Sequence, residues 1–149
     1  MGDCLFWVCF LEDFYYADEA VNAGFYVEAD GVCFPGEGWT DFVVSVLDMW
    51  ISNIMTCHGC ERANFKLFFM DGPYFIECSK VGDAVHMRCI ENRWELIVVC
   101  EMDVLFADLV REITGITGVV IEAIERQEFG VVRYLDDLKA NFERLRLLS

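Results

Sequence analysis

The first 61 residues contain no lysine or arginine. They hold 11 acidic side chains, whereas the rest of the chain has 15 acidic and 11 basic residues, which gives a net charge of −15. Such an acidic protein repels phosphate backbones and anionic lipid headgroups, so we expect neither a nucleic-acid nor a membrane partner. If the fold gathers the first segment on one side, its field would attract a basic macromolecule over a Debye length of about 8–10 Å. A solvated face without a ligand is the alternative.

Long hydrophobic runs are also lacking. No run approaches the roughly 18–20 residues of a membrane span, because Asp48 interrupts the apolar stretch 42–51. The start of the chain, 1–6, lacks the basic residues of a secretory signal. The eight cysteines lie mostly within hydrophobic runs such as 98–100, where cysteine behaves as a small apolar residue. We therefore expect a soluble, cytoplasmic protein with reduced thiols.

The composition is that of a folded domain. Of the 149 residues, 56% are hydrophobic and 15% are aromatic, which excludes a disordered chain. There is no repeat, linker or low-complexity tract, and the length suits one domain. We expect a single α+β domain over residues 1–149.

Hydrophobic periodicity predicts three strands in the first third of the chain, at 4–10, 25–28 and 32–34. The pair Asp30-Gly31 between two apolar runs is typical of a hairpin. Apolar residues at spacings of three and four then predict a helix over 40–56, with Thr40 as its cap and Asp41, Asp48 and Ser52 toward water.

From Asn64 the period changes to two, which predicts a four-stranded antiparallel meander ending at Cys100. Asp103 is a candidate cap for a helix over 105–113, while 119–127 fits a helix or a short strand, and 131–145 predicts a final helix. We expect a mainly antiparallel, twisted sheet of about six to seven strands. The mid-chain helix and the C-terminal helices would pack on one of its faces.

Few residues suggest catalysis or metal binding. Cys57-His58-Gly59-Cys60 could hold zinc or exchange disulfides, but no second ligand pair follows and the motif comes after a helix instead of opening one. The other histidine, His86, lies mid-strand without a candidate nucleophile beside it. Paired carboxylates are abundant but form no calcium-loop pattern. We expect no enzyme activity, catalytic residue, metal or cofactor.

Three segments resemble a known family. They are Asp30-Gly31-x-x-Phe34-Pro35, the segment 39–42 that opens a helix containing Leu47 and Trp50, and the strand–turn–strand 67–74. Over residues 25–100 this pattern is similar to the small acidic immunity proteins of bacterial polymorphic and contact-dependent growth inhibition toxin systems. The resemblance implies a cytosolic antitoxin that binds a cognate toxin domain, often a basic nuclease, and blocks it stoichiometrically. It implies no catalytic residue.

The acidic N-terminal segment also carries aromatic side chains that could anchor a partner. The candidate partner-binding residues are Glu12, Asp13, Tyr15, Tyr16, Asp18, Glu19, Glu28, Asp30 and Glu37. For the two tyrosines, packing on the core is the alternative. Two other functions stay open: a thiol- or zinc-dependent protein centred on Cys57 and Cys60, and an acidic adaptor or DNA-mimic inhibitor.

Overall fold

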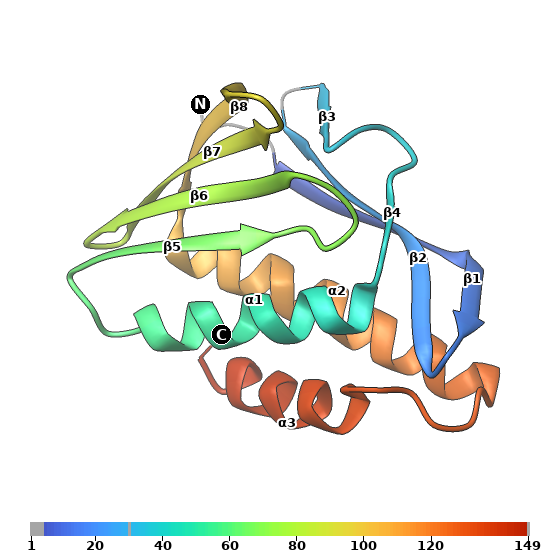
Figure 1. The fold of residues 1–149 in the computed structure, drawn as a ribbon. Coiled ribbons are helices and arrows are strands. Elements are labelled where there is room, and N and C mark those ends of the chain that lie inside the picture. Colours follow the sequence, from blue (N-terminus) through green and yellow to red (C-terminus); the bar gives the residue numbers. More distant parts are fainter. Residues whose placement is uncertain (1–4, 30, 149) are drawn as a thin grey trace.

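The computed structural model describes residues 5–29 and 31–148, with side chains from residue 14 onward. Figure 1 shows two sheets above a layer of helices. Sheet A contains β1 (Leu5–Ala17), β2 (Ala20–Ala29), β3 (Val32–Phe34) and β4 (Thr40–Asp41). Sheet B contains β5 (Arg62–Phe68), β6 (Tyr74–Val81), β7 (Ala84–Asn92) and β8 (Leu96–Leu105). The helices are α1 (Val43–Cys57), α2 (Phe106–Gln127) and α3 (Leu135–Arg146).

Strand β2 is the centre of sheet A. It pairs antiparallel with β1, β3 and β4, and Ala29 lies opposite Val32 across the predicted hairpin. Alternate side chains of β2 from Val21 to Ala29 are buried in the core. The opposite face of β2 carries Asn22, Tyr26 and Glu28, as expected from the period of two.

Sheet B is the predicted meander, with the strand order β5-β6-β7-β8. Its inner face contributes side chains such as Leu67, Ile76 and Met87 to the core. Its outer face carries a charged row in which Lys66, Glu77, Arg88 and Glu101 are successive cross-strand neighbours. The change to period-two hydrophobicity at Asn64 thus predicted these four strands correctly.

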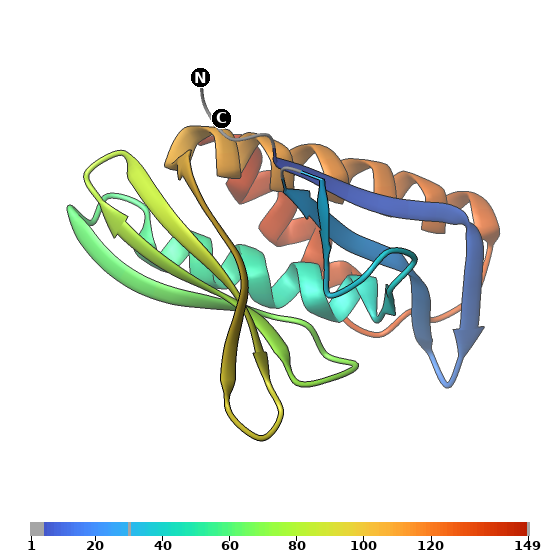
Figure 2. The ribbon, with the colours of Figure 1, turned by 90° about the horizontal axis from the view of Figure 1, so that it is seen from above.

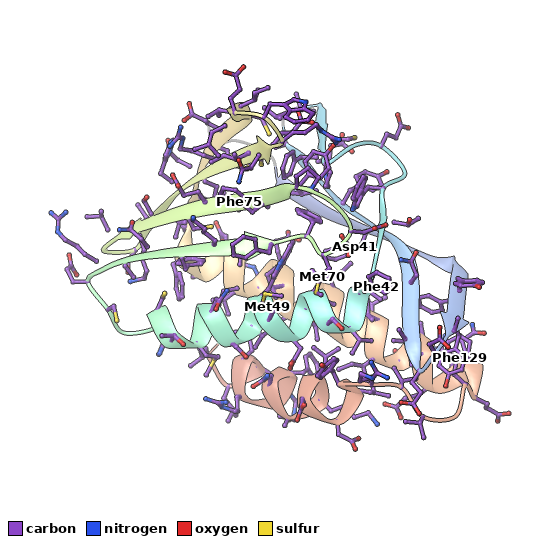
Figure 3. The ribbon with its side chains drawn as sticks, in the orientation of Figure 1. Asp41, Phe42, Met49, Met70, Phe75 and Phe129 are labelled. Atoms are coloured by element: carbon purple, nitrogen blue, oxygen red, sulfur yellow. The ribbon has the colours of Figure 1, made fainter. Side chains whose placement is uncertain are left out.

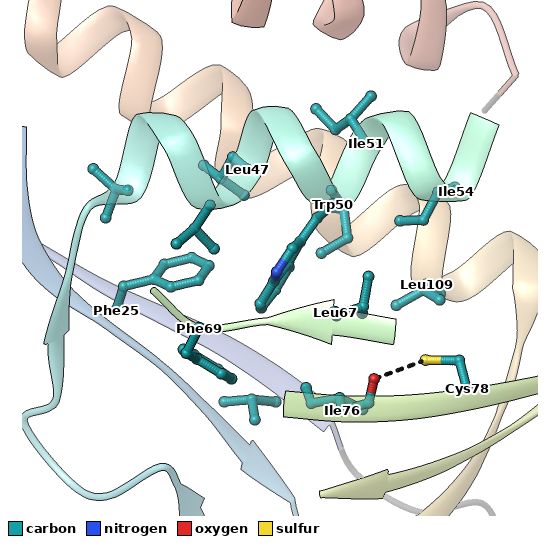
Figure 4. Packing of buried hydrophobic residues seen from close by; sticks show 14 of the residues in the cluster. Phe25, Leu47, Trp50, Ile51, Ile54, Leu67, Phe69, Ile76, Cys78 and Leu109 are labelled. Atoms are coloured by element: carbon teal, nitrogen blue, oxygen red, sulfur yellow. Dashed lines mark hydrogen bonds between the residues drawn. The ribbon is translucent and has the colours of Figure 1, made fainter. Parts of the chain in front are cut away.

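Helix α1 joins the two sheets to the helical layer. One cluster of buried side chains includes residues of both sheets and all three helices. At its centre the Trp50 ring lies 5.3 Å from the rings of both Phe25 and Phe69 (Figure 4), and its Nε1 donates a hydrogen bond to the Phe68 carbonyl at 2.7 Å. Helix α3 is tied to α1 by a 2.7 Å hydrogen bond from Asn141 to Asp48.

Asp41 fastens the start of α1 to the β5–β6 loop, where Figure 3 shows it near Met70. The side chain is 0% exposed. Its carboxylate accepts hydrogen bonds from the backbone N–H groups of Phe42 (2.8 Å), Met70 (3.1 Å) and Asp71 (3.3 Å), and from Trp39 Nε1 (3.1 Å). Burial raises the pKa of Asp41, and these four donors act in the opposite direction.

The expected helix starts are therefore wrong at two places. Thr40 and Asp41 form a short strand instead of a helical cap, because Asp41 is taken into the interior; α1 begins at Val43 without a side-chain cap. Asp103 lies within β8, and α2 begins at Phe106. The ambiguous segment 119–127 is helical, as the last part of α2.

The strand count also differs from the expectation of one sheet with six to seven strands. The described residues form eight strands in two sheets. Strand β1 does not stop before Glu12 but continues to Ala17, and β4 adds a two-residue strand. No helix in the described residues combines the length and the apolar character needed to cross a membrane.

Candidate protein-binding surface

The turn between β1 and β2 places two acidic residues in a conformation unusual for them. Ala17 pairs with Ala20, so Asp18 and Glu19 form a two-residue turn with φ values of +52° and +64°. This left-handed backbone is the one that Asn-Gly pairs favour in hairpins. The Glu19 carbonyl accepts a 2.7 Å hydrogen bond from the Arg133 N–H, and its carboxylate lies 3.6 Å from the Arg133 guanidinium.

The two candidate tyrosines point to opposite faces of β1. Tyr15 is 69% exposed and lies opposite Asn22. Tyr16 stacks on Phe129 with a centroid distance of 4.8 Å, and its hydroxyl donates to the Val131 carbonyl. Figure 3 shows Phe129 beside this end of the sheet. Tyr15 is thus available to a partner, whereas Tyr16 holds sheet A against the segment that follows α2.

Two further candidates lie at the other end of sheet A. Glu28 on β2 faces outward and is the cross-strand neighbour of Cys33, and Glu37 is exposed in the loop before β4. Burial raises the pKa of Tyr26, and the charges of Cys33, Glu37 and Glu28 raise it further. Burial, Glu28 and Glu37 also raise the pKa of the Cys33 thiol. Burial is the main cause of both pKa shifts, and the carboxylates of Glu28 and Glu37 add to them.

Sheet A differs from the rest of the molecule because it carries no lysine or arginine; the first basic residue along the chain is Arg62. Within the described part of the chain, Asp18, Glu28 and Glu37 have no ion pair, and Glu19 has only Arg133. Acids without an ion pair among the described residues also occur elsewhere, for example Glu112 and Asp136, but there basic residues lie among the acids and several of them form ion pairs. Those within 4 Å of a carboxylate are Arg88, Arg93, Arg111, Arg126, Lys139 and Arg146. The side chains of Glu12 and Asp13, and the whole of Asp30, lie outside the described residues.

The outer face of sheet B brings together a serine, a histidine and an aspartate. Ser79 is the cross-strand neighbour of His86, and His86 is the neighbour of Asp103. The expectation that no candidate nucleophile lies beside His86 is therefore wrong, because Ser79 lies next to it in the sheet. However, the histidine Nδ1 lies 2.8 Å from a carboxylate oxygen of Asp103, and its Nε2 lies 3.4 Å from one of Glu101. Neither nitrogen is hydrogen-bonded to the serine.

This row is poorly suited to nucleophilic catalysis. The hydrogen bond to Asp103 is the main reason that the pKa of His86 is raised, with Glu101 contributing and burial opposing. A general base must accept the nucleophile's proton, and both ring nitrogens of His86 are directed at carboxylates and not at Ser79. The row therefore lacks the serine–histidine hydrogen bond that nucleophilic catalysis uses.

Cys57 and Cys60 lie at the C-terminal end of α1. Cys57 is buried, and burial raises the pKa of its thiol, as does Cys60, while Lys80 acts in the opposite direction. Cys60 is exposed and its Sγ lies 3.8 Å from the Thr56 carbonyl. The negative end of a helix dipole disfavours a thiolate, unlike the N-terminus used by redox CxxC motifs. In the described residues, no three His, Cys, Asp or Glu side chains group closely enough to share a metal ion.

The exposed apolar hairpin between β7 and β8 was not predicted from the sequence. The segment 94–100 was expected only as a strand of the meander. In the structure every residue from Asn92 to Val99 is exposed, including Trp94 at 94%. A run of consecutive apolar residues does not distinguish a buried strand from one that extends beyond the body of the protein.

Comparison of the chain with protein-family models, with curated proteins and with solved structures gives no match.

Proposed function

We propose that this protein is an immunity protein, an antitoxin that binds and neutralises a basic toxin domain such as a nuclease. The observation that carries the proposal is the outward side of sheet A. There Asp18, Glu28 and Glu37 have no ion pair within the described residues, and Tyr15 stands exposed on the same sheet. The proposed partner is a protein, and no nucleic acid, membrane or cofactor takes part.

The charge distribution favours rapid association with a cation. Four of the five bases on α2 and α3 form ion pairs with acids of these two helices, as in the Arg111–Asp108 and Arg126–Glu122 pairs. Sheet A has no base, so its acids contribute to the net charge of −15 without such compensation. Such a field can raise association rates above the roughly 10⁵–10⁶ M⁻¹s⁻¹ of neutral pairs, which benefits a protein that must inhibit a toxin before damage accumulates.

The dimensions of this surface suit a protein partner. Tyr15 lies opposite Asn22, and Glu28 follows six residues further along β2. At about 3.3 Å per residue these two positions are roughly 20 Å apart, with Tyr26 buried between them, so a standard interface of about 800 Å² per partner could contact both ends. Tyr15 offers a large ring of the type that contributes most to affinity, with carboxylates near both ends of the surface.

The β1–β2 turn supports the same function. Left-handed backbone costs about 1–2 kcal/mol for most residues other than glycine, with Asp among the better tolerated. Asp18 and Glu19 both adopt it. Strained residues concentrate at functional sites, and acidic side chains at this turn extend the negative surface to the edge of the molecule.

We expect the reading frame immediately upstream to encode a large secreted protein with a variable C-terminal domain, and the test uses that domain in a catalytically inactive form. We expect tight, one-to-one binding by calorimetry that weakens as salt rises. The double variant Glu28→Lys/Glu37→Lys should weaken binding by about 10- to 100-fold. In a toxin activity assay the same variant should inhibit less.

A matched control separates the position of the charges from their sum. Glu112 on α2 and Asp136 on α3 have no ion pair among the described residues and lie outside sheet A. The variant Glu112→Lys/Asp136→Lys changes the net charge equally and should keep most of the affinity. Equal losses in both double variants would mean that net charge alone drives binding, and no loss in either would place the interface elsewhere.

A further inference from the structure

The β7–β8 hairpin exposes apolar side chains on both faces of a strand. Leu96 is 64% exposed, Ile97 46%, Val98 38% and Val99 41%. Successive strand residues point to opposite faces, so neither face of β8 is covered along this stretch. In Figure 2 the hairpin extends away from the helices, at the bottom of the view.

The backbone of β8 is also available for pairing. Sheet B ends at β8, which pairs with β7, and no other described strand pairs with it. Proteins usually protect such edges with lysine, proline or an inward-pointing charge. Here the four residues from Leu96 to Val99 are all apolar. A bulge beside Cys89 and Ile90 leaves Val99 without a cross-strand neighbour.

An apolar row on the outer face continues up to this edge. Phe68, Phe75, Ile90 and Val98 are successive cross-strand neighbours, and the rings of Phe68 and Phe75 lie 5.4 Å apart. A cavity of about 430 Å³ beside this row has Phe68, Phe75 and Leu96 in its lining. A strand added to β8 would extend the row by one apolar side chain.

The charges near β8 indicate which kind of strand could pair with its edge. Strand β8 carries no basic residue, and its acids Glu101 and Asp103 pair with Arg88 and His86 of β7. In the turn before β8, Glu95 has no ion pair in the described part of the chain, whereas Arg93 pairs with Glu91. A second copy of this chain would place these carboxylates near their equivalents and join two molecules of −15 charge. A segment that alternates apolar and basic residues would match both the apolar strand and the acids.

We propose that β8 binds an extended apolar and basic segment of the toxin domain by strand addition, as a second contact besides sheet A. This inference rests on the proposed function for the identity of the partner. Main-chain hydrogen bonds to the β8 edge would provide affinity, and valine- or leucine-like side chains would cover the residues from Leu96 to Val99.

The direct test needs no toxin. The probe is the peptide acetyl-Lys-Val-Lys-Val-Lys-Val-amide, added at up to about 1 mM, the range expected for a weak interaction. Amide hydrogen exchange by NMR should slow at residues within 96–99, because strand addition places those N–H groups in hydrogen bonds. Side-chain contact alone would not slow exchange in this pattern.

Two double variants act as test and control. Ile97→Lys/Val99→Lys puts cations on the exposed strand and should abolish the protection. Val119→Lys/Val131→Lys makes the same change at two other exposed valines and should preserve it. Because all four side chains are exposed, both variants should fold.

The other outcomes each overturn the proposal. Peptide-induced protection that is absent from β8, or that survives in Ile97→Lys/Val99→Lys, contradicts strand addition. A dimer of the free chain by sedimentation, with 96–99 already protected, assigns the edge to a second copy. A shift of Trp94 fluorescence with phosphatidylcholine vesicles but not with peptide assigns it to lipid. The failure of the toxin-binding test at Glu28 and Glu37 would instead reject the proposed function and leave the peptide result standing.

Discussion

Replacing Asp41 by alanine should destabilise the protein strongly. The carboxylate is 0% exposed and accepts hydrogen bonds from four N–H groups. Phe42, Met70 and Asp71 are exposed, so water can replace part of each of their hydrogen bonds, and we count the four bonds as equivalent to about two. At about 1.5 kcal/mol for each hydrogen bond to a charged group, Asp41→Ala should cost about 3 kcal/mol.

Urea denaturation measures this loss. With a slope of about 1.5–2 kcal/mol per molar urea, the midpoint should fall by about 1.5–2 M. Asp41→Asn keeps one carbonyl acceptor and should lose about half as much. The control Asp71→Ala removes an exposed carboxylate from the same loop and should change the midpoint little. A loss below about 1 kcal/mol in Asp41→Ala would refute the view that this side chain holds α1 to the β5–β6 loop.

Two further predictions concern titration and the β1–β2 turn. The pKa of His86, followed by NMR, should lie above about 6.5 and fall in Asp103→Asn. Because the pKa of His86 is raised in the folded state, its contribution to stability is complete below pH about 6.5 and is lost as the pH rises through the folded-state pKa. An unchanged titration curve in Asp103→Asn would contradict the pairing of His86 with Asp103. Asp18→Asn/Glu19→Gly should raise the unfolding free energy by about 1 kcal/mol while weakening toxin binding. A variant that is less stable and binds the toxin with unchanged affinity would contradict both expectations.

Local patterns predicted the α+β class and most of sheet B. The period-two alternation from Asn64 reflects one buried and one open face, and this pattern is visible in the sequence. The division into two sheets was not predictable, because it depends on which strands pair across long separations. The prediction of Thr40 as a helix cap was wrong for a related reason. The same local sequence fits a helix cap or a short strand, and only the burial of Asp41 distinguishes the two.

Only part of the arrangement of the candidate residues could be predicted from the sequence. Charge along the chain identified the acidic segment, and the structure places Glu28 and Glu37 at one end of sheet A and Asp18 at the other. Composition could not show that Tyr16 packs on Phe129, since a side chain's direction depends on the register of β1. Nor could it show that the segment 96–99 is exposed.

The most direct test of the central claim is amide hydrogen exchange of this protein with and without the toxin domain. The outward side of sheet A should be covered, so exchange should slow in the segments 15–28 and 32–37 and stay unchanged through α2 and α3. Protection of the helices with none in sheet A would contradict the account.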